Sequence, residues 1–255
     1  MVQLKTDTSI EAMREAGRVV AQVLAAVRGA AKVGVSLREL DEVARGVLRA
    51  AGAGSPFLDY KPHFAPTPFP AVICASVNDA IVHGIPTDRR LRDGDLLSID
   101  AGATLGGWVG DSAVTFTVGR ARPDDTRLTD TAFEALDAGI AAAVVGNRIG
   151  DIAHAIGTVC RKAGYGIPEG FGGHGVGRSM HEDPAVPNEG RPGRGMPLRH
   201  GMVLAIEPML IAGGRDEFHP DRDGWTLRTS DGSRAAHAEH TVAITDAGPR
   251  ILTAL

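Results

Sequence analysis

The sequence predicts an α/β domain of the α+β type that spans residues 1–255 and contains two related halves, at about 8–120 and 121–250. Two observations predict this class. The first is that two helix-forming stretches followed by strand-forming stretches occur twice, once in each half. The second is composition, because 43% hydrophobic residues can build a core while aromatic residues contribute only 4%. The core must therefore consist mainly of Ala, Val, Leu and Ile.

The helices are predicted from their caps. Thr8 or Ser9 can cap a helix over about residues 10–31. The sequence SLRE at 36–39 is a capping-box pattern, and the helix that it opens ends at Gly52. The helices expected in the second half cover about residues 126–145 and 150–163. The strands expected from apolar runs are 71–77, 96–101, 109–118 and 202–209.

An internal repeat relates the strands of the two halves. With an offset of 107, LRDGDLLSID at 91–100 aligns with LRHGMVLAIE at 198–207 and places Asp100 opposite Glu207. Similarly, His83 and its following glycine resemble His174 and its following glycine. Chance similarity could explain the Ala- and Gly-rich helices, but it explains the strand poorly. A duplication would bring Asp100 and Glu207 to equivalent sides of one central site.

Two carboxylates are predicted to face each other across a hairpin. A turn centred on Leu105 and Gly106 pairs Asp100 with Asp111. Paired residues share a face, with Cβ atoms about 4.5 to 5.5 Å apart. Carboxylates held so close in apolar surroundings repel each other, so a cation, most plausibly a metal ion, is expected between them. The alternative is a different turn and two ordinary solvated aspartates.

The segment 55–70 contains five prolines and much of the aromatic content of the chain. It cannot form regular structure, and it could either wall a pocket or serve as a rigid connector. His83 lies in a short apolar segment, and a lone histidine there is more often structural than catalytic.

Charge and cysteine content exclude several classes of function. The net charge is −4 and the sequence has no basic run, so we expect no DNA partner. Cys74 and Cys160 are too few for a disulfide scaffold or a cysteine-based zinc site. No apolar run approaches the roughly 18 residues of a membrane span, and the start lacks a signal-peptide core. We therefore expect a cytoplasmic protein without a membrane partner.

Five residues are the candidate metal ligands: Asp100, Asp111, His174, Glu207 and Glu239. Glu239 opens an apolar strand that could return antiparallel to 202–209 and so lie beside Glu207. Four carboxylates and one imidazole suit manganese, iron, cobalt or zinc. Four negative charges are too many for one divalent ion. A pair of ions roughly 3.5 to 4 Å apart balances them and can activate a water as nucleophile.

These residues also carry a family resemblance. The motifs are Asp100 with Asp111, GGHGVG at 172–177, HEDP at 181–184, IEPM at 206–209, DGWT at 223–226 and EHT at 239–241. In this order and spacing they resemble the type I methionine aminopeptidases over essentially the whole chain. The resemblance implies the pita-bread fold, a duplicated α/β domain with a curved antiparallel sheet backed by helices. It also implies that Asp100 chelates one metal ion, that His174 and Glu207 bind the other, and that Asp111 and Glu239 bridge both.

The resemblance assigns further roles in catalysis. Glu207 would take a proton from the nucleophilic water. His181 would contact the scissile amide and the oxyanion, and His83 would contact the scissile nitrogen or the substrate amine.

The resemblance also places residues around the substrate. Cys74 and Trp225 would line the pocket for the methionine side chain. Tyr60 and Phe69 are further candidates for contacts with the substrate, from a loop about six residues longer than is usual in the family. Whether His63, Phe64 or Phe69 replaces the aromatic and histidine of that loop stays open. His237, Ala238 and Met180 stand where Gln, an aromatic and Phe are commoner.

The expected function is removal of the initiator methionine from nascent polypeptides, with preference for a small second residue. We expect a monomer that contacts nascent N-termini and, transiently, the ribosome. The alternatives are an Xaa-Pro peptidase, a paralogue with relaxed specificity, and a non-catalytic binding protein of the same fold.

Overall fold

The computed structural model describes residues 2–63 and 65–255. In this part of the chain the helices are α1 (Asp7–Ala30), α2 (Leu37–Ala50), α3 (Pro123–Ala142) and α4 (Ile149–Lys162). The first-half strands are β1 (Ile73–Val77), β2 (Ala80–Val82), β3 (Asp95–Leu105) and β4 (Trp108–Val118). The second-half strands are β5 (Gly172–Gly175), β6 (Glu182–Pro187), β7 (Val203–Ile206), β8 (Met209–Ile211), β9 (Phe218–Pro220), β10 (Leu227–Thr229), β11 (Ala235–His237), β12 (His240–Thr245) and β13 (Gly248–Ile251).

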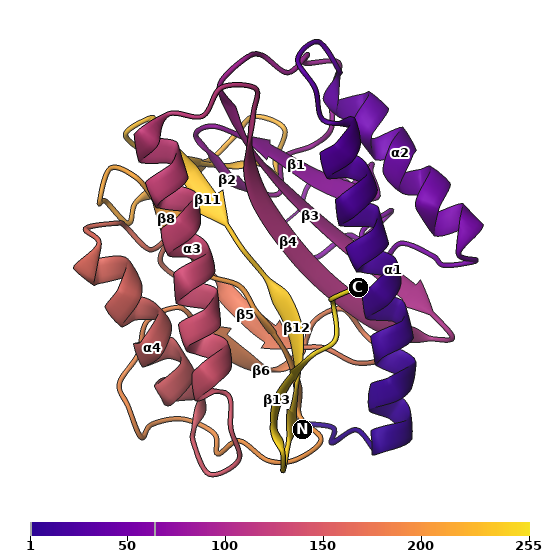
Figure 1. Ribbon diagram of the computed structural model, residues 1–255, viewed down its shortest axis with the longest axis vertical. Coiled ribbons are helices and arrows are strands. Elements are labelled where there is room, and N and C mark those ends of the chain that lie inside the picture. The colour runs from indigo at the N-terminus through magenta and orange to yellow at the C-terminus, as the bar shows by residue number, and fades with distance from the viewer. Residues whose placement is uncertain (1, 64) are drawn as a thin grey trace.

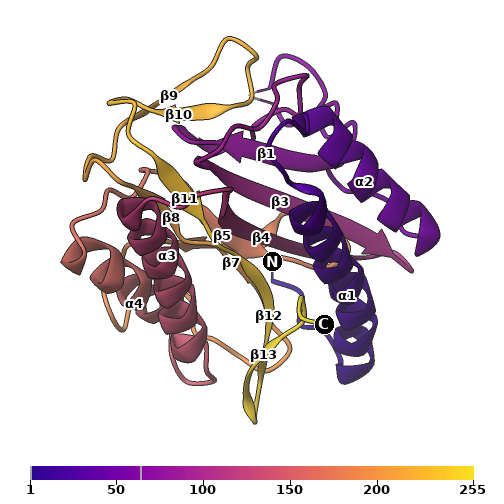
Figure 2. The ribbon, with the colours of Figure 1, turned by 45° about the horizontal axis from the view of Figure 1, so that its top comes forward.

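Two larger sheets and two small ones make up the β layer. The first-half sheet has the order β1-β3-β4, and the second-half sheet has the order β13-β12-β7-β5-β6. All pairs in them are antiparallel. The pair β8-β11 and the three strands β2-β10-β9 form the small sheets, and β9 and β10 lie at one end of the molecule, at the top of Figure 2.

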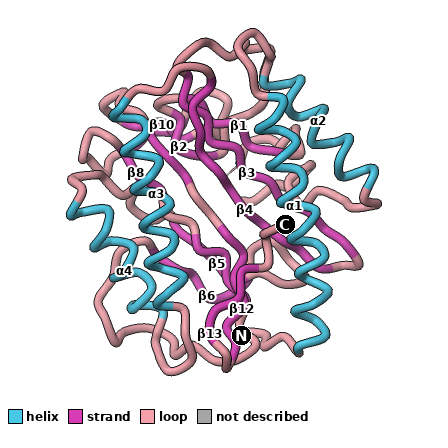
Figure 3. Tube along the Cα trace, in the orientation of Figure 1, coloured by secondary structure: helices cyan, strands magenta, loops and turns pink. Residues whose placement is uncertain are grey.

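The two halves join along β4 and β12. The N–H groups of Ala113 and Glu239 donate to each other's carbonyl oxygens, at 3.4 and 3.0 Å. One step along, the hydroxyl of Thr241 accepts from the N–H of Asp111 and donates to its C=O. Figures 1 and 3 show β4 and β12 along the middle, with α1 and α2 on one side and α3 and α4 on the other. The halves therefore share one β layer, and the seam carries Asp111 and Glu239.

The helices begin at residues that can cap them. Ser36 and Glu39 form the predicted capping box of α2. The cap of α1 is Thr6, and not Thr8 or Ser9 as predicted, because its side chain accepts from the N–H of Ser9. The helix α3 begins earlier than predicted, with Pro123 in its first turn, where a missing N–H costs nothing.

Each half has its own apolar core. The first consists mainly of α1, α2, β1 and β3 and includes Val20, Leu40 and Leu97, which are fully buried. The second lies between α3, α4 and the second-half strands and includes Leu136 and Ile206. Both cores consist mainly of aliphatic residues, as the composition predicts.

The register of the β3-β4 hairpin differs from the prediction. Asp100 pairs with Ala113, and Asp111 pairs with Gly102. The turn consists of Gly106 and Gly107, both with positive φ, which a two-residue type I′ turn requires and which Leu105 would adopt only under strain. The shift is two residues and side chains alternate with period two, so Asp100 and Asp111 still share a face as diagonal neighbours.

The predicted strand at 202–209 is interrupted, since β7 ends at Ile206 and β8 begins at Met209. The residues in the gap, Glu207 and Pro208, therefore lie outside the ladder. The correspondence between His83 and His174 is also wrong. Under the offset of 107, the strand register makes Ser76 the counterpart of His174.

Candidate metal centre

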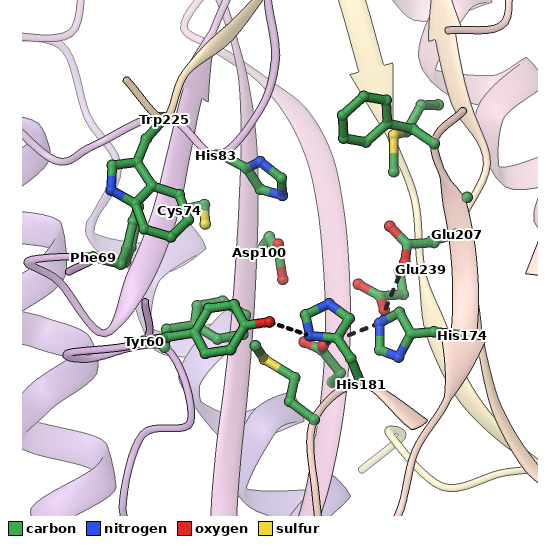
Figure 4. A pocket seen from close by; sticks show the side chains of 16 residues that line it. Tyr60, Phe69, Cys74, His83, Asp100, His174, His181, Glu207, Trp225 and Glu239 are labelled. Atoms are coloured by element: carbon green, nitrogen blue, oxygen red, sulfur yellow. Dashed lines mark hydrogen bonds and ion pairs between the residues drawn. The ribbon is translucent and has the colours of Figure 1, made fainter. Parts of the chain in front are cut away.

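A cavity of about 260 Å³ lies between the two halves and has two chemically different walls. One is polar and carries the five predicted ligands, from β3, β4, β5 and the two gaps that follow β7 and β11. The other is apolar and includes Tyr60, Phe69, Cys74 and Trp225. Figure 4 shows Asp100, His174, Glu207 and Glu239 facing this aromatic wall.

Glu207 and Glu239 lie opposite each other because both interrupt paired strands. His240 pairs with Ile206 on one side of the gaps, and His237 pairs with Met209 on the other. The same register places the two glutamates side by side, as the sequence predicts. The backbone of Glu207 is fixed by Asn188, whose side-chain amide donates to its carbonyl oxygen at 3.0 Å.

The carboxylates and histidines converge at distances that suit a shared cation. The Nε2 atom of His174 is 3.5 Å from Oε1 of Glu207 and 3.9 Å from Oδ2 of Asp111. One ligand atom each from Asp111, His174 and Glu239 lie within 4.8 Å of one another. Such a set of one nitrogen and several oxygen donors suits borderline divalent ions.

Unpaired buried atoms support this fit. Oδ1 of Asp100, Oδ1 of Asp111 and Oε1 of Glu239 are buried and lack a hydrogen-bond partner among the described residues. Buried carboxylate oxygens without a partner are costly, and a metal ion is the partner that relieves several at once. The residues present therefore fit a metal centre.

The pKa shifts have the same cause. Burial raises the pKa of Asp100 to about 7, and burial together with the neighbouring carboxylates raises the pKa values of Asp111 and Glu239 well above their usual range. Burial also acts on Glu207, but the adjacent His237 and His174 outweigh it and lower its pKa. Without a cation the cluster holds protons, while Glu207 stays ionised.

Two further histidines lie around the cavity. The ring of His181 stacks against Tyr60 and lies 4.2 Å from that of His174, between centroids. Its Nδ1 atom is 3.3 Å from the Tyr60 hydroxyl. Burial lowers the pKa values of both His181 and His83 to about 4, so both are neutral near pH 7. His83 has a φ of 60°, which is unusual for a residue with a side chain and is typical of functional sites.

Comparison with known proteins agrees with this geometry. The model of metallopeptidase family M24 matches residues 11–246. The chain belongs to metallopeptidase family M24. Methionine aminopeptidase 1 of Mycobacterium tuberculosis is 53% identical, with 99% of this chain and 95% of the relative covered. Methionine aminopeptidase of Clostridium acetobutylicum is 46% identical, with 99% of both chains covered.

Solved structures share the fold of this chain. The crystal structure of methionine aminopeptidase from Thermotoga maritima matches with a TM-score of 0.95 and 38% identity over 100% of both chains. Prolidase from Pyrococcus furiosus matches with a TM-score of 0.79 and 24% identity, and this chain covers 65% of its length. The pita-bread fold expected from the resemblance is thus confirmed. Membership of the metallopeptidase family implies divalent metal binding.

The proline-rich segment walls the pocket of this metallopeptidase. Phe69 packs edge-on against Trp225, with 5.1 Å between ring centroids, and the Trp225 indole donates to the carbonyl oxygen of Thr67. Phe69 and Tyr60 line the cavity, whereas His63 is exposed and Phe64 lies outside the described residues. Of the two readings of the segment, the pocket wall is the correct one.

Several residues near the site were missed by the roles assigned from the sequence. Nε2 of His237 is 3.2 Å from Oε2 of Glu207, and His237, Glu207 and Glu239 form a second group that could hold a metal ion. The only sequence signal was an unusual residue two positions before Glu239. Phe171 lines the cavity without any motif to mark it, and Met209 lines it from the IEPM motif without a role assigned from the sequence.

In the described residues of this metallopeptidase, no helix is both long and apolar enough to cross a membrane.

Proposed function

We propose that this M24 metallopeptidase removes the N-terminal methionine from newly made polypeptides. The observation that carries the proposal is the union of the two walls, since a cluster of metal ligands lies directly beside an apolar pocket. An unbranched, apolar side chain suits a pocket lined by Phe69, Cys74 and Trp225. The two relatives compared by sequence above are named methionine aminopeptidase 1 and methionine aminopeptidase.

The metal centre would hold two divalent ions of cobalt, manganese, iron or zinc. The residues that would hold them are Asp100, Asp111, His174, Glu207 and Glu239. When bound, such ions supply Lewis acidity and lower the pKa of a bound water. By the family resemblance, the free α-amine of the substrate would reach the metal ion that Asp100 holds, which would restrict cleavage to the chain terminus.

Glu207 is the general base in this proposal. Its pKa is lowered despite burial, so the carboxylate is ionised and can accept a proton from the nucleophilic water at neutral pH. Having taken the proton, Glu207 can return it to the departing amine.

The neutral histidines act where charge develops. Tyr60 can donate to Nδ1 of His181, which leaves Nε2 of that ring as the protonated nitrogen and a donor to the oxyanion. His83 lies on the other wall, near Trp225, and would contact the scissile nitrogen or the substrate amine. Neither histidine has to lose a proton before it can act near pH 7.

The partners of this enzyme would be nascent polypeptide N-termini, with transient contact to the ribosome. It would act in the cytoplasm as a monomer, with preference for a small second residue.

Three peptides test the proposal: one beginning Met-Ala, one beginning Met-Leu and one beginning Ala-Pro. We expect the metal-loaded protein to release methionine rapidly from the first, slowly from the second, and to leave the third intact. Preferential cleavage of the Ala-Pro peptide would replace the proposed function with that of an Xaa-Pro peptidase. Metal binding without turnover of any of the three would indicate a binding protein.

A further inference from the structure

The loop that carries His181 is held from behind by one carboxylate. Glu182 follows His181 directly and opens β6. Its Oε1 atom accepts hydrogen bonds from the backbone N–H groups of Arg178, at 2.8 Å, and Ser179, at 3.2 Å. The same side chain therefore closes the turn between β5 and β6. His174 lies in β5, before this turn, and His181 is the last residue of the turn.

The second oxygen of this carboxylate binds a lysine from the far end of the sequence. Nζ of Lys5 lies 2.7 Å from Oε2 of Glu182, and the two side chains are only 2% and 17% exposed. The backbone N–H of Lys5 donates to the carbonyl oxygen of Gly201 at 2.7 Å, which fixes the lysine just before the start of α1. The attraction within an ion pair so shielded from water is stronger than within the exposed pair of Arg38 and Asp88, whose side chains are 63% and 85% exposed.

The packing around this pair leaves it little freedom. A Cβ atom on Gly177 would clash with the carboxylate of Glu182 and approach Cε of Lys5 to 2.7 Å. On its open side, His181 is held by the hydroxyl of Tyr60. Tyr60 thus holds the ring of His181, and Glu182 holds the backbone of the loop that precedes it.

We propose that Lys5 is a positioning residue, which acts through Glu182 to hold His181 at the oxyanion position. The inference rests on the role proposed above for His181. Without the ammonium group, the carboxylate of Glu182 lowers its free energy by turning toward water, because a buried charge without a partner is costly. In turning, it releases the N–H groups of Arg178 and Ser179. The loop then relaxes, and the oxyanion loses a donor held in place before the reaction.

The test is a double-mutant cycle on hydrolysis of a Met-Ala peptide by the metal-loaded protein. Lys5→Met removes the charge and keeps the length of the side chain, and His181→Ala removes the group through which Lys5 acts. We expect Lys5→Met to lower kcat about tenfold with little change in KM or metal content, in a protein with a lower Tm that is still folded at the assay temperature. In the His181→Ala background the same substitution should have no further effect on kcat, because coupled residues are not additive. Lys5→Arg should restore most of the loss.

Arg250→Met is the control, because Arg250 also forms an ion pair between distant parts of the chain, with Glu11 of α1, and neither of these two residues lines the cavity. It should leave kcat unchanged. Full activity of folded Lys5→Met, or an equal loss in the His181→Ala background, would overturn the positioning role alone. Full activity of His181→Ala would instead remove the role proposed for His181. Should Lys5→Met fail to fold, Glu182→Gln breaks the same ion pair, and normal kcat in that variant would overturn the inference equally.

Discussion

The hydroxyl of Thr241 accepts from the N–H of Asp111 at 2.9 Å and donates to its C=O at 2.7 Å. Across the seam, Thr115 makes the same two bonds, at the same two distances, with the backbone of His237. Each half thus contributes a threonine whose hydroxyl holds, in the other half, the backbone of a residue at the metal centre. The hydrogen bonds that join the two halves therefore also position residues of the metal centre.

Replacing Thr241 by Val should destabilise the protein by roughly 1–3 kcal/mol, because the shape is kept but a buried N–H and C=O lose their partner. The measurement is urea denaturation of the metal-free protein. We also expect weaker metal binding in calorimetry, since Asp111 is a predicted ligand. Thr241→Ser keeps the hydroxyl and should recover most of both quantities. A Val variant as stable as the parent would show that the seam bonds contribute nothing.

Replacing His174 or Glu207 by Ala should abolish hydrolysis of Met peptides while the protein stays folded. For Glu207→Ala the loss should be at least about 10²-fold, which is the lower end of the usual contribution of a general base. For His174→Ala the loss follows from the missing metal ligand. Circular dichroism and Tm serve as controls for folding, and steady-state kinetics supply the readout. Near-normal turnover in either variant would remove that residue from the proposed mechanism.

Metal removal should make stability depend on pH between about 6.5 and 8. Raised pKa values mean that folded Asp100, Asp111 and Glu239 bind protons that the unfolded chain has already lost. The stability of the metal-free protein must therefore fall as pH rises through this window. His83 and His181, with pKa values of about 4 when folded, are neutral in the folded state, and in the unfolded chain they lose their charge as pH rises past about 6.5, so they oppose the fall only at the lower end of the window.

The measurement is Tm after chelation, at a series of pH values, with and without added Mn²⁺ or Co²⁺. The metal-loaded protein should show the smaller dependence, because bound ions keep the carboxylates ionised. Asp100→Asn should reduce the slope of the metal-free protein. A metal-free Tm that rises from pH 6.5 to 8 would contradict the shifts, and full activity without metal would refute the mechanism.

The sequence predicted the position of a site residue where turn and strand-pairing patterns near that residue determine it. Asp100 and Asp111 were predicted to share a face, and they do, although the pairing was wrong by two residues. The error came from choosing Leu105 over Gly107 for the turn, and the period-two alternation of side chains made it harmless. Glu207 and Glu239 followed from strand pairing in the same way.

Contacts between distant segments could not be predicted in that way. Nothing local to Lys5 indicates a partner 177 positions later, and nothing local to His237 indicates Glu207. The resemblance to a family supplied motifs, but His237 departs from its pattern, so its contact had to come from tertiary structure.

His237 should influence the acid limb of activity through its contact with Glu207. Burial raises the pKa of Glu207, whereas His237 and His174 lower it, and the second influence prevails. Replacing His237 by Leu removes the partner 3.2 Å from Oε2, so burial gains weight and the pKa of Glu207 rises. Since the general base must be ionised, the acid limb of kcat should move to higher pH.

His237→Gln can still donate an N–H to the carboxylate and should keep the limb near its original position. Profiles of kcat against pH for the two variants, at saturating metal, provide the measurement; a Leu variant with an unmoved acid limb would show that His237 does not act on Glu207.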